Sequence, residues 1–181
     1  MQHRQEFPLA PLPAHAAWWL WLPVAFAAGA VVVAMGMQSR TPPPMALWLA
    51  IPLVLLIGAG LALALRRRRI VLDNRQLQVQ ATLYTRKLAV EALDLDKARV
   101  LSLEEHTDLR PMLKTNGFSL PGFKAGHFRL RNLTRAFCLV TDATRVLALP
   151  LRDGGMLLLS PARPADLLAR LRELATPPPR R

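Results

Sequence analysis

Two long stretches without charged side chains dominate the first third of the chain. Residues 16–37 and 45–65 contain no Asp, Glu, Lys, Arg, His, Asn or Gln. At a rise of about 1.5 Å per residue, helices of this length span roughly 30 Å, which is the hydrocarbon thickness of a bilayer. The pattern predicts transmembrane helices over 16–37 and 45–65, joined by a short external loop over 38–44. The alternative for the first stretch is a signal peptide that is cleaved.

Four consecutive arginines follow the second stretch directly, whereas the connecting loop carries only Arg40. Positive residues that flank a span are retained on the cytoplasmic side, so both chain ends are expected in the cytoplasm, including an N-terminal segment over 1–15. The arginines form a polybasic neck over 66–69 that should contact anionic lipid headgroups without specificity. The predicted topology and membrane-surface residues are Arg66, Arg67, Arg68 and Arg69.

From Ile70 onward, the pattern changes to short alternations of apolar and polar residues, which are typical of strands with one buried face. A first hairpin turns at Asp73–Asn74, and further turns are expected at Asn116–Gly117 and Pro121–Gly122. After the first hairpin, the alternation predicts strands over 84–90, 97–103, 127–132, 136–141, 145–149 and 156–159.

The end of the chain has a different period. Leu167, Leu168, Leu171 and Leu174 recur at helical spacing, and Asp166 lies where the first turn of a helix favours an acid. The pattern predicts one amphipathic helix that closes a small β domain over 70–175. The three prolines in the last six residues predict a disordered tail over 176–181.

Charge is unevenly distributed along the 181 residues, which carry 24 Lys and Arg against 12 Asp and Glu. Between Leu109 and Thr141 there are six bases and no acid, whereas acids outnumber bases just upstream. The basic stretch is a candidate contact for an anionic lipid or a protein partner; the alternative is an ordinary solvated strand surface. Self-association could instead occur through an exposed strand edge. The six candidates are Arg110, Lys114, Lys124, Arg129, Arg131 and Arg135.

No motif for catalysis or metal binding is present. Cys138 is the only cysteine and lies in an apolar run, and His106 and His127 lack the close spacing of a zinc site. Ser119 has its second glycine one position too late for a nucleophile elbow. We therefore predict no catalytic residues, no metal and no cofactor. The few aromatics form no stacking stripe, so nucleic acid is not an expected partner.

Several short motifs of the domain resemble a known family. They are Thr115-Asn116-Gly117, Leu120-Pro121-Gly122, Phe128-Arg129-Leu130-Arg131 and Arg152-Asp153-Gly154. With the preceding apolar hairpin, residues 70–175 resemble the bacterial pleckstrin-homology (PH) domain proteins of membrane-anchored type. The resemblance implies about seven strands in two nearly orthogonal sheets, or a small barrel, capped by one C-terminal helix, without catalytic activity. It does not extend to phosphoinositide binding, because the first hairpin lacks the basic motif of the eukaryotic relatives.

The sequence thus predicts an α+β membrane protein, with a two-helix transmembrane hairpin followed by a PH-like domain at the inner face of the cytoplasmic membrane. Its expected role is non-enzymatic binding or scaffolding, through a protein partner, self-association or anionic lipid. Two alternatives stay open: an accessory subunit of a larger membrane complex, and an enzyme with an unrecognised site. Alanine at Ser119, His127 and Asp153 would abolish turnover in an enzyme and leave the partners of a scaffold in place.

Overall fold

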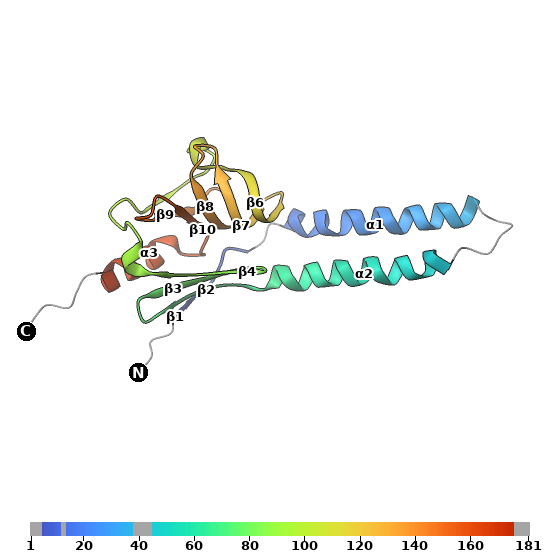
Figure 1. Ribbon diagram of the computed structural model, residues 1–181, viewed down its shortest axis with the longest axis horizontal. Helices are drawn as coiled ribbons and strands as arrows, with labels where there is room; N and C mark the ends of the chain where they lie inside the picture. The colour runs from blue at the N-terminus through green and yellow to red at the C-terminus, as the bar shows by residue number, and fades with distance from the viewer. Residues whose placement is uncertain (1–4, 12–13, 38–44, 176–181) are drawn as a thin grey trace, which may run out of the picture. The chain divides into compact units, whose positions relative to one another are not determined.

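The computed structural model describes residues 5–11, 14–37 and 45–175, with the helices and strands shown in Figure 1. The chain divides into two compact units: residues 14–66 form one, and the N-terminal residues up to 13 combine with residues 67 onward to form the other. The predicted external loop over 38–44 and the predicted disordered tail over 176–181 lie outside the described residues.

The first unit is a pair of helices, α1 (Ala14–Met37) and α2 (Met45–Arg66). A Cβ atom on Gly58 of α2 would lie 3.2 Å from the side chain of Val24 in α1, so the glycine allows close packing of the two helices. Large apolar side chains of both helices are exposed, among them Phe26 at 78% and Leu56 at 70%. Exposed apolar surface on this scale is typical of an interaction surface.

Among the described residues, no helix is both long enough and apolar enough to cross a membrane. The predicted transmembrane hairpin over 16–37 and 45–65 is therefore wrong for this structure. The prediction counted uncharged positions, and an uncharged stretch is not necessarily a strongly apolar one. Alanine, glycine and proline recur in both helices and add much less hydrophobicity than leucine, isoleucine, valine or phenylalanine.

The second unit begins with a four-stranded antiparallel sheet in the order β1-β2-β3-β4. The predicted alternation is confirmed in β3, where Leu77, Val79 and Ala81 are buried and the intervening glutamines are not. The hairpin before β3 turns at Asn74 and Arg75, which both have positive φ angles, as a tight two-residue hairpin turn requires. The strands are β1 (Gln5–Phe7), β2 (Arg68–Asp73), β3 (Gln76–Ala81) and β4 (Tyr84–Ala89).

Strand β1 comes from the N-terminal segment, and both helices separate it in sequence from the rest of its sheet. It pairs with β2, and the residues after it hydrogen-bond to the segment that follows β10 (Met156–Leu159). There, Ala10 N donates to Ser160 O at 3.1 Å, and Ala162 N donates to Pro8 O at 2.8 Å. Phe7 is only 8% exposed. The sequence did not predict this pairing, because a three-residue strand has too short an alternation to recognise.

The other sheet has six strands in the order β5-β9-β10-β8-β7-β6. Its pairs are antiparallel except for β10 with β8, which are parallel. The described residues therefore contain ten strands rather than the seven that the resemblance implied. The six are β5 (Arg99–Leu101), β6 (Pro111–Leu120), β7 (Phe123–Leu130), β8 (Arg135–Val140), β9 (Val146–Pro150) and β10 (Met156–Leu159).

Strand β6 corrects one of the predicted turns. Pro121–Gly122 is the turn between β6 and β7, but Asn116–Gly117 lies inside β6. Gly117 is paired with Gly126 of β7, and a Cβ on Gly117 would lie 2.6 Å from the carbonyl oxygen of Ala125. The glycine is therefore required for the close approach of two strands and not for a reversal of the chain.

The predicted closing helix is confirmed as α3 (Pro164–Ala175), with Leu167 and Leu171 fully buried. Burial of each leucine contributes about 2 kcal/mol to folding. A second apolar cluster contains Cys138, Phe128 and the leucines of residues 101–109. This segment includes the short 3-10 helix η2 (Thr107–Leu109). A further short 3-10 helix, η1 (Val90–Ala92), follows β4.

Candidate functional site

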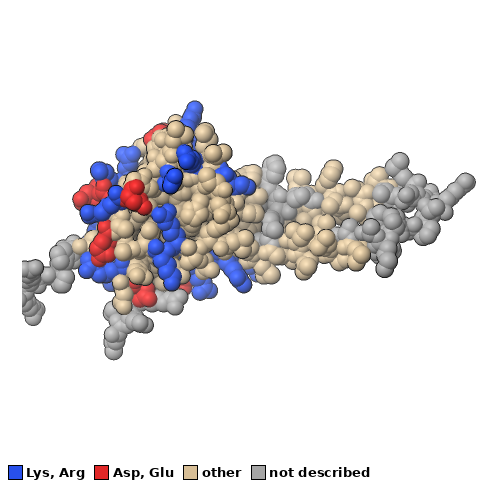
Figure 2. Space-filling view, in the orientation of Figure 1, with Lys and Arg blue, Asp and Glu red and all other residues tan. Residues whose placement is uncertain are grey.

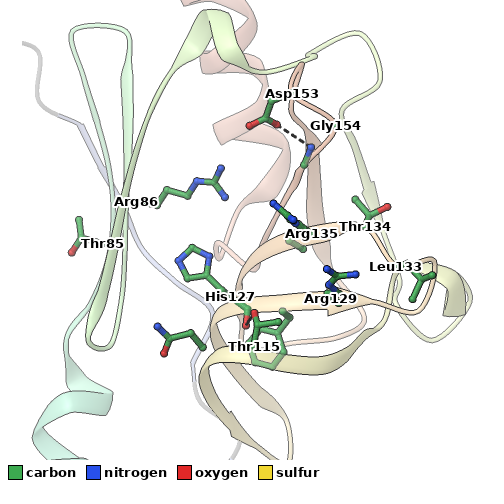
Figure 3. Close-up of a pocket in the computed structure, with 14 residues that line it drawn as sticks. Thr85, Arg86, Thr115, His127, Arg129, Leu133, Thr134, Arg135, Asp153 and Gly154 are labelled. Atoms are coloured by element: carbon green, nitrogen blue, oxygen red, sulfur yellow. Dashed lines mark hydrogen bonds between the residues drawn. The ribbon is translucent and has the colours of Figure 1, made fainter.

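An open cleft of about 1100 Å³ lies where β4 diverges from the strands of the six-stranded sheet. Figure 3 shows the side chains that line it, with Arg86 pointing from β4 into the space that His127 and Arg135 face. The remaining walls come from β6, the turn between β7 and β8, and the turn before β10. The lining residues are Thr85, Arg86, Thr115, Asn116, His127, Phe128, Arg129, Leu133, Thr134, Arg135, Ala136, Asp153, Gly154 and Gly155.

One end of the cleft is closed by a contact between the two sheets. The hydroxyl of Tyr84 in β4 donates a hydrogen bond of 2.6 Å to Oδ1 of Asn116 in β6. Gly126 lies beneath this contact with a φ of +111°, and a Cβ there would lie 2.6 Å from the Cα of Gly117 and 3.2 Å from the Tyr84 ring. Only glycine allows this approach, so a backbone feature sets where the two sheets meet.

Three arginines converge on the cleft from the two sheets. Arg129 of β7 and Arg135 of β8 are paired directly across the strands, and Arg86 enters from β4. Like charges directly opposite each other on a sheet are destabilising, so an anion between them would reduce their repulsion. Among the described residues, none of the three guanidinium groups has an ion-pair partner.

The cleft has one carboxylate, which belongs to Asp153. Its Oδ1 accepts a hydrogen bond of 2.9 Å from the backbone N–H of Gly155, so it stabilises its own turn. The other polar lining groups are hydroxyls, an amide and an imidazole, which can bind an anion or a neutral group. The lining therefore carries a net positive charge, and Figure 2 shows that Lys and Arg also outnumber Asp and Glu over the visible face of the strands.

His127 forms the floor of the cleft. Its ring lies edge-on to Phe137, with centroids 5.0 Å apart, and edge-on to Tyr84 at 6.1 Å. Burial lowers the pKa of the His127 imidazole below its usual value, and the positive charge of Arg86 lowers this pKa further. A neutral imidazole has one nitrogen that donates and one that accepts, so His127 can contact either kind of group.

Of the six basic residues predicted as contacts, Arg129 and Arg135 line the cleft. Lys124 donates from Nζ to Pro111 O at 2.6 Å, and burial lowers its pKa. Arg110 donates from Nε to Leu103 O at 2.6 Å and so stabilises the segment 101–109, which contributes leucines to the second apolar cluster. Lys114 and Arg131 are exposed and do not line the cleft.

The predicted polybasic neck is divided between two elements. Arg66 is the last residue of α2, and β2 begins at Arg68. Arg69 forms an ion pair with Glu6 of β1 at 3.6 Å, whereas the guanidinium of Arg68 lies 5.7 Å from the centre of the Phe123 ring. Burial lowers the pKa of Arg68.

The sequence missed Arg86 and Leu133 as cleft residues, and it named His127 only as a residue of a possible enzyme site. Tyr84, Arg86 and Leu88 alternate with exposed residues along β4, so their common face could have been recognised. Nothing in the sequence showed which strand that face would meet, because β4 and β7 belong to different sheets.

The residues considered for an enzyme do not assemble into a catalytic group. His127 and Asp153 line the cleft, but Ser119 does not, and no hydrogen bond joins His127 to Asp153 in the described structure. The described residues contain no cluster of three metal-binding side chains. Cys138 is buried, which raises the pKa of its thiol to about 12 and keeps it unreactive.

A family model described as a bacterial PH domain matches residues 68–175. No curated protein and no solved structure gives a significant match to the chain.

Proposed function

We propose that this chain, which belongs to the bacterial PH domain family, is a non-catalytic binding module that holds an anionic group in the cleft of Arg86, Arg129 and Arg135. Membership of the family fits a binding or scaffolding role in general. Family membership does not indicate which chemical group is bound; we infer an anionic group from the three arginines of the cleft.

The observation that carries the proposal is the placement, around one space, of three arginines that have no ion-pair partner in the described part of the chain. A guanidinium group presents its N–H donors in a planar fork that matches a carboxylate or a phosphate group with two parallel hydrogen bonds. An anion bound between Arg129 and Arg135 would also relieve their mutual repulsion. Each hydrogen bond to a charged group contributes about 1.5–3 kcal/mol when both partners are ordered.

Titration with a labelled hexaglutamate peptide and, separately, with pyrophosphate tests this proposal. The test variant replaces Arg129 and Arg135 with glutamine, and its matched control replaces Arg99 and Arg145, which are exposed and lie outside the cleft. Both variants lose the same charge. We expect the cleft variant to weaken binding of both anions by about tenfold or more and the control by less than about threefold. Equal losses in the two variants would show that net charge alone attracts the probes.

The cell location stays a prediction. The domain is expected at the inner face of the cytoplasmic membrane because the arginines over 66–69 would be attracted to anionic headgroups there. The orientation argument from flanking spans does not support this location, since the predicted spans were wrong. A protease added to intact cells should then leave the domain uncut. Digestion under these conditions would contradict the location without affecting the proposal for the cleft.

A further inference from the structure

We propose that the anionic ligand of the cleft is an extended acidic segment of a partner protein, which pairs with the free edge of β4 and places an apolar side chain beside Leu133. This inference rests on the proposed function and specifies its ligand. It depends on three features of the cleft: a regular strand edge, arginines on two walls, and an exposed apolar lip.

Strand β4 is the last strand of its sheet among the described residues, and it is regular. Its six residues pair with β3 in unbroken register, from Ala81 opposite Tyr84 to Gln76 opposite Ala89. The Ala81–Tyr84 pair closes a two-residue turn, so it is a hydrogen-bonded pair, and the ladder alternates from there. The N–H and C=O groups of Thr85 and Lys87 therefore point away from β3, and Thr85 lines the cleft.

The opposite edge, β6, is irregular along the same cleft. Its register with β7 shifts between Pro111 and Leu113 and again between Lys114 and Asn116. Thr115, in the second irregularity, donates its hydroxyl hydrogen to His127 O at 3.0 Å. Bulges of this kind prevent an edge from pairing with another strand. Of the two edges that border the cleft, β4 is therefore the one that can accept an added strand.

The charges fit a strand in this position. Side chains of an extended peptide alternate, and those on one face recur about every 6.8 Å. Arg86 on the β4 wall and the Arg129–Arg135 pair on the opposite wall can thus contact carboxylates at alternate positions of the same segment. A single phosphate could reach only part of a cleft of about 1100 Å³.

An apolar lip borders the cleft beside Arg129. Leu133 is 65% exposed and lines the cleft, and Leu113, the β6 partner of Arg129, is 56% exposed. Leu133 has a φ of +66°, which is unfavourable for leucine and normal for glycine or asparagine. The turn is nevertheless fixed, because Leu133 N donates to Leu130 O at 2.9 Å. A leucine held in a strained conformation with its side chain in solvent fits a contact with an apolar group of the ligand.

The three features separate the ligand classes. A soluble phosphate compound would use the arginines only. A lipid surface would use the arginines and the leucines but has no backbone for the edge of β4. A peptide segment would use all three, so its binding should depend on features that the other two ligands ignore.

The probe is a fluorescent, acetylated and amidated peptide, Thr-Glu-Thr-Glu-Thr-Leu-Thr, titrated against the full chain by anisotropy. Two analogues carry N-methyl groups, one on its threonines and the other on its glutamates and leucine. Only alternate residues of an added strand direct their backbone N–H groups to the edge of β4, and an N-methyl group removes this donor. We therefore expect one analogue to lose affinity by about tenfold or more and the other by less than about threefold. Equal affinities of the two analogues would overturn strand addition while leaving pyrophosphate binding, and thus the proposed function, intact.

Two variants test the remaining contacts. Lys87→Pro removes an N–H that points away from β3, with Lys87→Ala as its matched control; we expect only the proline variant to lose peptide affinity beyond the loss of charge. Leu133→Gly should reduce affinity for the peptide by about threefold to tenfold and leave pyrophosphate affinity unchanged. An unchanged peptide affinity in Leu133→Gly would overturn the apolar contact.

Vesicles of equal parts phosphatidylglycerol and phosphatidylethanolamine serve as the competing surface. We expect them to bind the chain with no effect of Lys87→Pro relative to Lys87→Ala. If the vesicles bind in a manner that depends on Leu133 and the peptide does not bind, the peptide proposal is overturned in favour of a lipid surface. Absence of peptide binding together with pyrophosphate binding would restrict the site to phosphate compounds and overturn the inference as well.

Discussion

Replacement of Gly126 by alanine should open the corner at which β4 meets β6, and two separate features of this residue set the cost. A Cβ at this position would lie 2.6 Å from the Cα of Gly117 and 2.7 Å from the backbone oxygen of Asn116, whereas carbon atoms pack at about 3.5–4.0 Å. Overpacking of this kind costs about 1–3 kcal/mol. The φ of +111° adds about 1–3 kcal/mol for a residue with a side chain. We therefore expect Gly126→Ala to lower the free energy of unfolding by about 2–6 kcal/mol.

Two other glycines separate these contributions. Gly154 has a φ of +81°, but a Cβ atom on it would have no atom within 4 Å other than those of its own residue and its two chain neighbours, so Gly154→Ala should show the conformational cost alone. Gly117 has no positive φ, but its Cβ would lie 2.6 Å from Ala125 O, so Gly117→Ala should show the contact cost alone. The predicted order of destabilisation places Gly126→Ala first.

The thiol of Cys138 provides the assay, because it is the only cysteine and is the β8 partner of Gly126. Its burial and raised pKa keep it unreactive in the folded domain, so its labelling rate in mild denaturant reports the population of opened molecules. A loss of about 3 kcal/mol should accelerate labelling by about two orders of magnitude. If Gly126→Ala labels no faster than Gly154→Ala, the close contact of β4, β6 and β7 is not as described.

Three further results are expected. An NMR titration should give His127 a pKa below 6.5, and Arg86→Gln should raise this pKa only partly, because desolvation is the larger cause; a pKa above 6.5 would contradict the partial desolvation of the ring in the cleft. Since the folded pKa lies below the unfolded one, stability should fall as the pH drops through about 6.5 and level off below the folded pKa, and His127→Gln should remove this pH dependence. Phe7→Ala should destabilise the domain by about 3 kcal/mol in chemical denaturation, whereas an unchanged midpoint would show that β1 does not contribute to the folded domain.

Local patterns predicted the elements whose partners are close in the sequence. The alternation of Leu77 and Val79 with glutamines identified β3, and the leucines around Leu171 identified α3, because one buried face determines the period in each case. The turn at Pro121–Gly122 was also correct. The turn predicted at Asn116–Gly117 was wrong, because this dipeptide lies inside β6. A glycine that favours a reversal of the chain also allows two backbones to approach closely, and only the partner strand determines which of these roles it has.

The cleft could be predicted only in part. The run of bases before Thr141 pointed to Arg129 and Arg135, but it also included Arg110 and Lys124, whose donors bind backbone oxygens. Arg86 reaches the same space from another sheet, and no sequence pattern encodes the distance between two sheets. The prediction for residues 16–65 failed for a different reason, because absence of charge was taken as sufficient evidence of a membrane span.

The central claim is that Arg86, Arg129 and Arg135 bind one anion together, and an NMR titration of their side-chain Nε–H signals with hexaglutamate tests it most directly. The account predicts that all three signals shift, saturate and give a single dissociation constant, whereas the signals of Arg99 and Arg145 do not saturate. Shifts that rise linearly for all five arginines, or different dissociation constants for the three in the cleft, would contradict it.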